Sequence, residues 1–321
     1  MNQFRIIFMG TPEFAVASLD LLLQNNYNIA AVVTVPDKPA GRGQQLQQSA
    51  VKKYALEKKL TILQPEKLKD ENFIKHLKVL NVDLQIVVAF RMLPEIVWNM
   101  PRLGTINLHG SLLPNYRGAA PINWAVINGE KETGVSTFFL QQEIDTGKII
   151  YQEKIQMDEN ETAGDIHDKL MHIGAQLILK TVKAIENGAY PQIDQSALTE
   201  ADEKIKLAPK IFKQDCRIDW SRSADEIHNQ IRGLSPYPTA FTDFVSPDGK
   251  LILVKIFSSK KEKKSLNYPV GSIISDSKSF IKIAVKDGYI LIEELQAAGK
   301  KRLAVNEFLR GFQLKNDWNV I

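Results

Sequence analysis

Three polar side chains in two short segments have the chemistry needed for acyl transfer. Asn107 and His109 alternate with apolar residues near the end of an expected strand, so they share one face of it. Histidine titrates near neutral pH and can move a proton, whereas the uncharged amide of asparagine can stabilise an oxyanion. Asp145, in the turn sequence D-T-G, could orient a histidine or handle a proton itself if burial raised its pKa. No candidate serine or cysteine nucleophile accompanies them, which favours direct attack by an acceptor substrate over a covalent acyl-enzyme.

Each of these residues also has an ordinary structural explanation. A strand histidine is more often a satisfied polar residue than a catalyst, and Asp145 could simply be a turn former that bonds its own backbone. Spacing alone does not bring Asp145 to His109. The chemistry therefore requires a fold that presents a strand end beside a loop, as open α/β sheets do at the carboxyl ends of their strands.

The first part of the chain predicts such a fold. Strand, helix and strand patterns follow one another at its start, with Thr11 as the expected helix N-cap, so we expect a right-handed crossover between parallel strands. The G-x-G-x-x-G and P-loop patterns are absent, so the sequence does not support NAD or a nucleoside triphosphate as a ligand. The expected strands are 4–9, 29–34, 61–63, 83–89, 104–108, 135–140 and 148–155, and the expected helices are 13–23, 49–60, 70–80, 95–98, 119–128 and 162–186. Residues 36–48 are polar and aperiodic, which predicts a long loop.

The last third of the chain predicts a small β-barrel. A helix over 224–232, capped by Ser223, precedes about five short strand patterns separated by turn signals. The expected strands are 239–245, 251–257, 270–275, 281–285 and 289–296. We therefore expect an α/β catalytic domain with a Rossmann-like open, mostly parallel sheet over 1–189, a linker over 190–208, and an OB-fold-like barrel over 209–321.

The formal net charge of +4 is unevenly distributed along the chain. Residues 207–321 carry 19 Lys and Arg against 13 Asp and Glu, a balance of +6, and the remaining residues have a balance of −2. A basic barrel beside a nearly neutral domain suggests that the barrel holds a polyanion. The simpler explanation of the run Lys260, Lys261, Lys263 and Lys264 is a solvated loop.

Cysteine content and hydropathy exclude several classes of protein. Cys216 is the only cysteine, so neither an intrachain disulfide nor a cysteine-rich metal site is possible. No apolar run approaches the roughly 20 residues that span a bilayer, and the amino terminus lacks a signal-peptide pattern. We expect a monomeric cytoplasmic protein that contacts no membrane and uses no metal.

Longer motifs resemble the 10-formyltetrahydrofolate-dependent formyltransferases over nearly the whole chain. N-L-H-G-S-L-L-P-N-Y-R-G-A-A-P at 107–121 and I-D-T-G at 144–147 are similar to the elements shared by all members. The more selective matches favour the branch that formylates initiator methionyl-tRNA. These selective matches are P-D-K-P-A-G-R-G at 36–43, I-D-W-S at 218–221, I-R-G-L-S-P at 231–236 and L-Q-A-A-G-K-K-R at 295–302. F-M-G-T-P-E-F-A at 8–15 is a further match to the family.

The resemblance implies a reaction and a set of site residues. The formyl group of 10-formyltetrahydrofolate, a co-substrate, would pass to the amino group of initiator methionyl-tRNA. The implied catalytic residues are Asn107, His109 and Asp145. The implied folate-binding residues are Ser111, Leu112, Leu113, Pro114, Phe90 and Leu93, and the implied tRNA-binding residues are Arg42 and Lys38. One departure from the family is Arg91-Met92, which stands where many members have a glycine and a small or apolar residue.

Two other functions fit parts of the sequence. A formyltransferase acting on a sugar nucleotide or a purine precursor would share the catalytic stretch but would not need this carboxyl-terminal domain. An RNA-binding protein on a decayed formyltransferase scaffold would use the barrel alone, although the intact Asn107, His109 and Asp145 argue against it.

Overall fold

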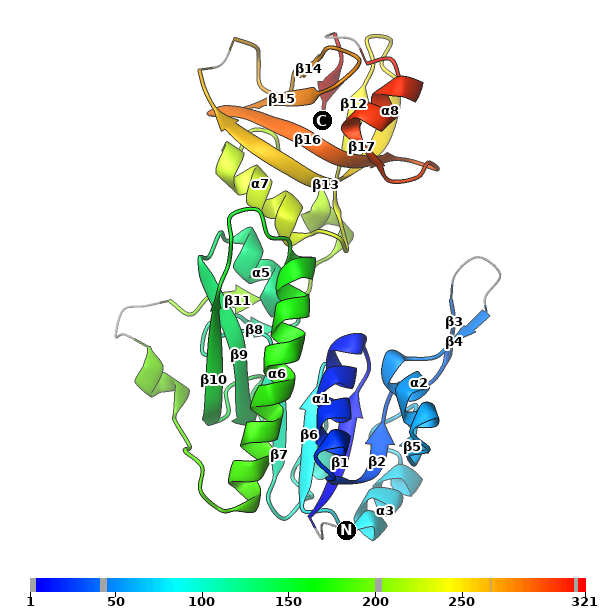
Figure 1. Ribbon diagram of the computed structural model, residues 1–321, viewed down its shortest axis with the longest axis vertical. Coiled ribbons are helices and arrows are strands. Elements are labelled where there is room, and N and C mark those ends of the chain that lie inside the picture. Colours follow the sequence, from blue (N-terminus) through cyan, green and yellow to red (C-terminus); the bar gives the residue numbers. More distant parts are fainter. Residues whose placement is uncertain (1–3, 41–44, 200–203, 266, 315–316) are drawn as a thin grey trace. The chain divides into compact units, whose positions relative to one another are not determined.

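The chain divides into two compact units in a computed structural model that describes residues 4–40, 45–199, 204–265, 267–314 and 317–321. The first unit comprises Met1–Gly118, Gly134–Ile155 and His167–Leu207. The second unit comprises Ala119–Thr133, Gln156–Ile166 and Ala208–Ile321. Figure 1 labels the elements of both units in chain order.

The first unit is built on a sheet that has seven strands in the described part of the chain, in the order β10-β9-β7-β6-β1-β2-β5. Strands β1, β2, β5, β6 and β7 run parallel, and β9 is antiparallel to β7. The strand bounds are Arg5–Gly10 (β1), Asn28–Val33 (β2), Ile62–Leu63 (β5), Leu84–Val88 (β6), Thr105–His109 (β7), Glu132–Phe139 (β9) and Ile149–Gln156 (β10). The predicted open, mostly parallel sheet is confirmed.

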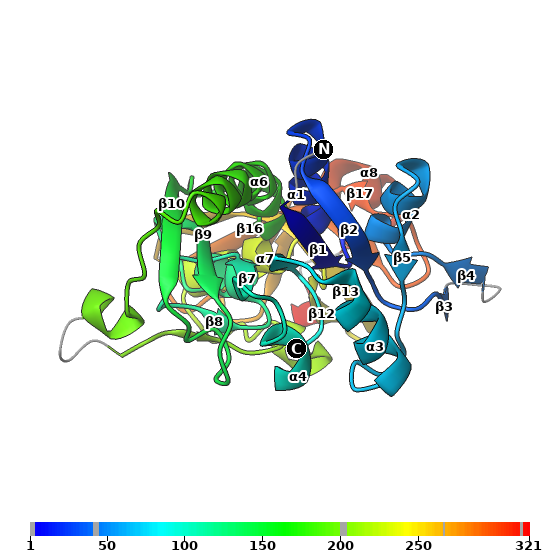
Figure 2. The same ribbon diagram turned by 90° about the horizontal axis from the view of Figure 1, so that it is seen from below.

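Helices cover both faces of this sheet, with α1 and α6 on one side and α3 and α4 on the other (Figure 2). Phe73 of α3 and Val97 of α4 pack in one cluster with Ile7 and Met9 of β1. On the opposite face, a Cβ atom added to Gly174 of α6 would lie 2.8 Å from Cδ2 of Leu108. The helix bounds are Glu13–Gln24 (α1), Ala50–Glu57 (α2), Glu71–Leu80 (α3), Glu95–Trp98 (α4) and Ala163–Glu186 (α6). Helix α1 has Pro12 as its N-cap rather than the predicted Thr11.

The strand order reverses at β1, and this brings several loops to one edge. The chain proceeds outward from β1 to β2 and β5, then returns to place β6 and β7 on the other side of β1. Because these strands are parallel, the segments that follow β1, β2, β6 and β7 all leave from the same edge of the sheet. Lys38, Phe90, Leu93 and the expected site residues over 107–114 therefore lie in or just before segments at this edge.

The long loop predicted over residues 36–48 is partly wrong. Strands β3 (Lys38–Ala40) and β4 (Gln45–Gln47) pair antiparallel there, with Lys38 opposite Gln47. Among its described residues, neither face of this hairpin packs against the core, so its strands do not need alternating apolar and polar residues. The sequence pattern therefore did not predict them. Residues 41–44 between the strands, which include Arg42, lie outside the described residues.

The second unit contains the predicted antiparallel barrel. Its strands follow the order β14-β15-β16-β13-β12-β18, with β17 paired to β16. A bridge between Ser272 and Asn319 joins the two ends of this order, so the barrel is nearly closed. The bounds are Ala240–Val245 (β12), Leu251–Lys263 (β13), Ile273–Ser275 (β14), Ile281–Val285 (β15), Gly288–Ala297 (β16), Leu303–Ala304 (β17) and Asn319–Val320 (β18).

Helices complete the core of the second unit. Ser223 caps α7 in a reciprocal capping box with Glu226, as the sequence predicts for its N-cap. Ile227 and Ile231 of α7 pack with Phe244 and the other barrel residues. The helices are α5 (Pro121–Ile127), α7 (Ala224–Gly233) and α8 (Val305–Gly311), and the short remaining elements are β8 (Arg117–Gly118), β11 (Leu207–Ala208), η1 (Gln195–Leu198) and η2 (Lys213–Cys216).

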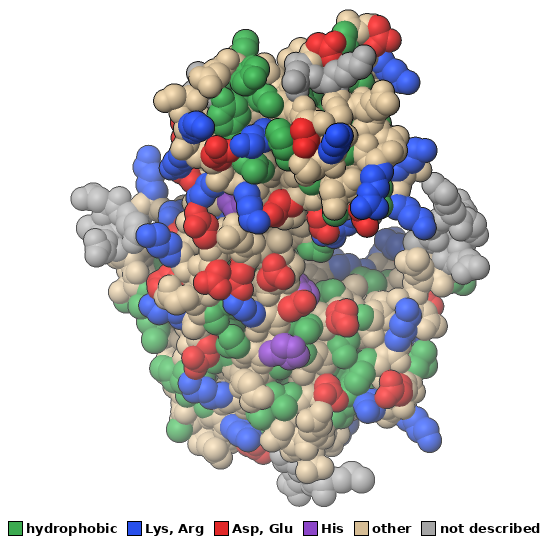
Figure 3. All heavy atoms as spheres, turned by 45° about the horizontal axis from the view of Figure 1, so that its top comes forward, with side chains coloured by type: hydrophobic (Ala, Val, Ile, Leu, Met, Phe, Trp, Pro, Cys, Tyr) green, Lys and Arg blue, Asp and Glu red, His purple; other side chains and the backbone are tan. Residues whose placement is uncertain are grey.

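The lysine run of the second unit belongs to a strand rather than to a solvated loop. Lys260, Lys261 and Lys263 lie on β13, which extends six residues beyond its predicted end at residue 257. Lys261 Nζ lies 2.5 Å from Glu159 and 2.6 Å from Asp225. Basic and acidic side chains are also interspersed on the face in Figure 3. Much of the local positive charge is therefore paired within the protein.

Candidate active site

Strand β7 brings Asn107 and His109 to one face and turns Leu108 to the other, against α6. His109 is buried, with 6% of its surface exposed, and Asn107 is half-buried. Within the described part of the chain, the Asn107 amide has no hydrogen-bond partner. Its N–H donors are therefore available to a ligand at the end of the strand.

The structure brings Asp145 to His109, which sequence spacing could not establish. His109 Nδ1 lies 3.7 Å from Asp145 Oδ2, and His109 Nε2 lies 2.8 Å from the carbonyl oxygen of Tyr116. A carbonyl only accepts, so Nε2 carries a proton and donates it. Nδ1 therefore faces the carboxylate at a separation longer than a hydrogen bond. In this tautomer both atoms are acceptors, so Nδ1 can donate to the carboxylate only after it gains a proton.

Asp145 occupies a tight turn between β9 and β10. Its φ of +54° lies in the left-handed region, and its Oδ2 accepts a 2.9 Å hydrogen bond from the backbone N–H of Gly118. Two residues later, a Cβ atom on Gly147 would lie only 1.7 Å from the carbonyl oxygen of Phe139. The Asp145 carboxylate thus bonds Gly118, 27 residues away in sequence, and not its own turn as the turn-former explanation supposed, and the backbone of the turn places it near His109.

Gln195 and Arg117 support this turn, and sequence reasoning missed both. Gln195 is 4% exposed, and its Nε2 donates to the carbonyl oxygens of Asp145 and Gly147, both at 2.8 Å. Its Oε1 accepts from Arg117 Nε at 3.0 Å and from Arg117 Nη2 at 2.6 Å. Gln195 lies in the polar stretch predicted to be a linker, so its local sequence contained no signal of burial.

The segment expected to contact folate, Ser111 to Pro114, is held by neighbouring strands. Ser136 Oγ donates to the Ser111 carbonyl oxygen at 2.7 Å and accepts from the Leu113 N–H at 3.0 Å. Gln152 Nε2 donates to the Leu113 carbonyl oxygen at 2.9 Å, and the peptide bond between Leu113 and Pro114 is cis. Ser111, Leu113 and Pro114 are buried and Leu112 is half-buried. The loop is therefore fixed before any ligand arrives.

The second expected folate segment follows β6. Leu93 is buried in the cluster with Val97, and Phe90 packs against the same cluster while remaining half-buried. Arg91 stacks its guanidinium carbon 5.3 Å from the centre of the Phe90 ring. Of the two expected tRNA-binding residues, Lys38 is an exposed residue of β3 and Arg42 lies outside the described residues.

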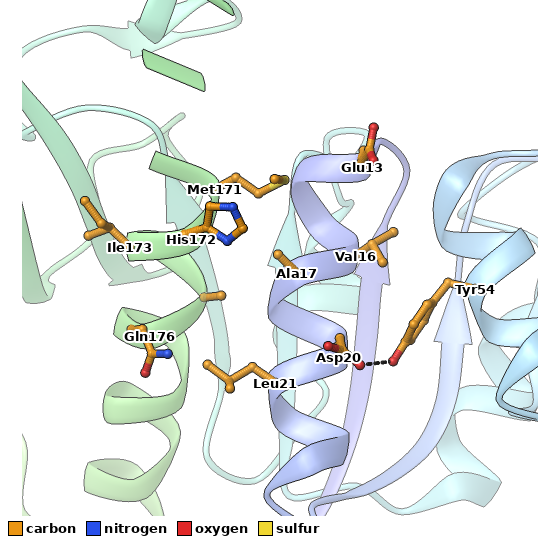
Figure 4. Close-up of a pocket in the computed structure, with 11 residues that line it drawn as sticks. Glu13, Val16, Ala17, Asp20, Leu21, Tyr54, Met171, His172, Ile173 and Gln176 are labelled. Carbon is orange, nitrogen blue, oxygen red and sulfur yellow. Dashed lines mark hydrogen bonds between the residues drawn. The ribbon is translucent and has the colours of Figure 1, made fainter. Parts of the chain in front are cut away.

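A separate groove of about 560 Å³ runs between α1, α6 and Tyr54 of α2. In Figure 4, Asp20 and Tyr54 are joined across one side of it by a hydrogen bond from the phenol to the carboxylate. His172 of α6 lines the other side. The groove contains none of the expected catalytic residues. In the described part of the chain, no cluster of His, Cys, Asp and Glu could hold a metal ion, and no helix is long and apolar enough to cross a membrane.

Comparison with known proteins identifies the family. The family described as Formyl transferase matches residues 4–182, and the one described as Formyl transferase, C-terminal domain, matches residues 210–313. The chain belongs to the formyl transferase family. The family resemblance seen in the sequence motifs is therefore confirmed.

This formyl transferase is similar to full-length relatives named methionyl-tRNA formyltransferase. It is 54% identical over 319 residues to that of Bacteroides thetaiotaomicron, with 99% of each chain covered. It is 55% identical over 313 residues to that of Bacteroides fragilis, covering 98% of this chain and 96% of the relative. Among solved structures, WlaRD, a sugar 3N-formyl transferase in the presence of dTDP and 5-N-formyl-THF, has a TM-score of 0.65 at 23% identity, covering 94% of this chain and 100% of that chain. That last likeness supports the fold.

Proposed function

We propose that this protein transfers the formyl group of 10-formyltetrahydrofolate to the free amino group of methionyl initiator tRNA, giving N-formylmethionyl-tRNA for translation initiation. The observation that carries the proposal is the approach of His109 Nδ1 to Asp145 Oδ2 at 3.7 Å, with Asn107 on the same face of β7. The full-length relatives support the acceptor, because they are 54% and 55% identical and are named for it.

The proposed mechanism is direct attack without a covalent enzyme intermediate. The methionyl amino group forms a bond to the formyl carbon while the carbonyl π electrons move to oxygen. The Asn107 amide donates a hydrogen bond to that oxyanion, which its free N–H donors allow. As the tetrahedral intermediate collapses, the bond from carbon to N10 breaks, the attacking nitrogen loses a proton, and N10 gains one.

His109 and Asp145 handle these protons in the proposed mechanism. The Nε2–H of His109 is committed to Tyr116, so Nδ1 is the nitrogen free to accept a proton. An imidazolium formed in this way would face the Asp145 carboxylate, whose charge stabilises it. The Asp145 carboxylate in turn is oriented by the N–H of Gly118. Proton delivery toward N10 then runs from this pair, directly or through a water.

The two substrates have separate proposed binding elements. The pterin and its formyl group lie against Ser111, Leu112, Leu113 and Pro114, with Phe90 and Leu93 on the other side. Lys38 and Arg42 of the hairpin segment and the basic barrel contact tRNA. We further propose a catalytic domain over 1–189, a linker over 190–208 and a tRNA-binding domain over 209–321, in a monomeric cytoplasmic enzyme.

The decisive experiment offers the protein one labelled donor and several acceptors. Purified protein is incubated with 10-formyltetrahydrofolate labelled in the formyl group and with charged initiator tRNA, an aminosugar nucleotide or a purine precursor amine. We expect label to appear in the methionyl ester of the tRNA and in neither small amine. Transfer to a small amine instead would establish the rival formyltransferase reaction. Tight tRNA binding without any transfer would indicate the RNA-binding alternative.

A further inference from the structure

Residues 64–66, which follow β5, contact two segments that the proposed function assigns to different substrates. On one side lies the segment 90–93 after β6, expected at folate. On the other lies the base of the β3–β4 hairpin, expected at tRNA. All three segments belong to the first unit and leave the sheet at the same edge.

Arg91 joins the folate segment to residues 65 and 66. Its Nη2 donates to the Pro65 carbonyl oxygen at 2.8 Å, and its Nη1 donates to the Glu66 carbonyl oxygen at 3.0 Å. Two bonds from different nitrogens of one planar guanidinium restrict its orientation as well as its distance. The guanidinium also stacks on the Phe90 ring, with its carbon 5.3 Å from the ring centre. Arg91 therefore contacts both the folate segment and residues 65 and 66.

Gln64 joins the same segment to the hairpin base. Its Nε2 donates to the Val35 carbonyl oxygen at 2.8 Å and to Asp37 Oδ1 at 2.9 Å. Lys52 of α2 binds the other carboxylate oxygen of Asp37 at 2.6 Å. These contacts, with the Lys52 hydrogen bond as the main cause, hold the pKa of Asp37 below its usual value. The carboxylate immediately before β3 is therefore fixed in its charged form.

The carboxyl-terminal end of the hairpin is also linked by hydrogen bonds to the ends of β2 and β5. Ser49, which caps α2 after β4, lies with its Oγ 2.7 Å from Thr34 Oγ1. The N–H of Thr34 donates to the Leu63 carbonyl oxygen at 3.0 Å. Both ends of the hairpin are thus linked by hydrogen bonds to residues 63 and 64, so a displacement of these residues would reach both ends.

The surroundings of Arg91 are energetically unfavourable for a charged side chain, which suggests that the residue has a role. Burial lowers the pKa of its guanidinium, and no carboxylate in the described part of the chain is paired with it. Its Nε is buried without a hydrogen-bond partner there. Arg91 is half-buried, and partial desolvation of a charge that contacts only carbonyl oxygens and the Phe90 ring in the described residues is unfavourable. A small or apolar residue at this position would avoid that cost but would also release residues 65 and 66.

We propose that residues 64–66 are a clamp that fixes the folate segment and the tRNA hairpin relative to each other, with Arg91 and Gln64 as positioning residues. The proposal rests on the proposed function for the identity of the two substrates. It assigns neither residue a contact with the reacting atoms. Its mechanical part, the linkage of the two segments, stands independently of which acceptor the enzyme uses.

The mechanical part is tested by hydrogen exchange in the whole protein. We compare wild type with Arg91→Gln, Arg91→Lys and Gln64→Leu, and use Arg102→Gln as the matched control, because Arg102 makes an exposed ion pair with Asp83 elsewhere in the same unit. Arg91→Gln is expected to accelerate exchange about fivefold or more in peptides covering both 89–94 and 35–40. Arg91→Lys should restore part of the protection, and Arg102→Gln should change neither peptide. Acceleration confined to 89–94 in both Arg91 variants would overturn the clamp.

The functional part is tested by steady-state kinetics with both substrates. Gln64→Leu should raise the KM for methionyl-tRNA on the order of fivefold, with kcat changed less than about twofold. Arg91→Gln should raise the KM values for tRNA and for the folate donor together. The double variant should raise the tRNA KM no more than the larger single effect, because both act through one segment.

Two results would contradict the functional part: an Arg91→Gln enzyme with an unchanged tRNA KM, or single effects that simply multiply in the double variant. Both results require an active wild type. Failure of the proposed function would instead appear as a wild type without formyl transfer to tRNA, and hydrogen exchange would still decide the clamp.

Discussion

His109 is held by two contacts that define its protonation chemistry. The Tyr116 carbonyl oxygen, 2.8 Å from Nε2, fixes the tautomer, and the Asp145 carboxylate lies 3.7 Å from Nδ1. Asn107 contributes no titrating group and lies one alternation away on the same face. In the proposed mechanism, proton transfer and oxyanion binding are therefore assigned to chemically different groups.

Removing either β7 side chain should slow the chemical step. We expect His109→Ala to reduce the single-turnover rate of formyl transfer by about 10²–10⁴-fold. Asn107→Ala should reduce it by about 10²–10³-fold, because an oxyanion donor is lost. The measurement is rapid-quench transfer at saturating tRNA, with folate binding measured in parallel. A wild-type rate in either variant would exclude that residue from the proposed mechanism.

At the scale of elements, the turn between β9 and β10 depends on close packing. Gln195 of η1 bonds the backbone of the turn at two carbonyls, and Gly147 passes against the Phe139 carbonyl oxygen. No side chain larger than hydrogen fits at Gly147, because its Cβ would lie 1.7 Å from that oxygen. The position of Asp145 is therefore a property of the packed turn and not of the D-T-G tripeptide.

Gly147→Ala should damage stability and activity together. Forcing a methyl group against a backbone carbonyl should lower the free energy of unfolding by about 2 kcal/mol. It should also move Asp145, so kcat should fall at temperatures where the variant is fully folded. Denaturant titration and formylation assays measure the two effects. Gly311→Ala is the control, because its added Cβ meets no atom within 4 Å. Equal behaviour of the two variants would mean that the turn adapts easily.

At the scale of the whole molecule, charge is expected to govern tRNA affinity. The basic residues of 207–321 exceed the acidic ones by six, yet several lysines of β13 already pair with carboxylates. We therefore expect phosphate binding to depend on cations outside these internal pairs, and the exposed Lys38 and the sequence-predicted Arg42 are the proposed ones.

The dissociation constant for methionyl-tRNA should rise steeply with salt. If about four phosphates are neutralised, the slope of log affinity against log salt concentration should be roughly −3 or steeper. Arg42→Ala should make this slope shallower by about one unit and weaken tRNA binding, with folate affinity nearly unchanged. Filter binding between low and physiological salt measures both values. A slope near zero would show that phosphate contacts contribute little.

Much of the architecture could be predicted from the sequence because it depends on local patterns. Apolar periodicity located the parallel strands and helices, and Ser223 was correctly identified as the cap of α7. The hairpin Lys38–Ala40 with Gln45–Gln47 escaped prediction because each strand has only three residues, too few for a periodic pattern, and the first contains a proline. Strand β13 was predicted too short, because its lysines continue the strand while pairing with carboxylates outside it.

By itself, the sequence determined the chemical types at the candidate site and the strand that carries two of them. Asn107 and His109 share a face simply because side chains alternate along β7. Only the tertiary structure decided that Asp145 lies near His109, that Gln195 bonds the turn between β9 and β10, and that residues 64–66 contact both Arg91 and the base of the β3–β4 hairpin. These contacts join residues 25 or more positions apart, and no local periodicity encodes a partner that far along the chain. They arise where parallel strands end at one edge of the sheet, and that edge exists only once the strands are ordered.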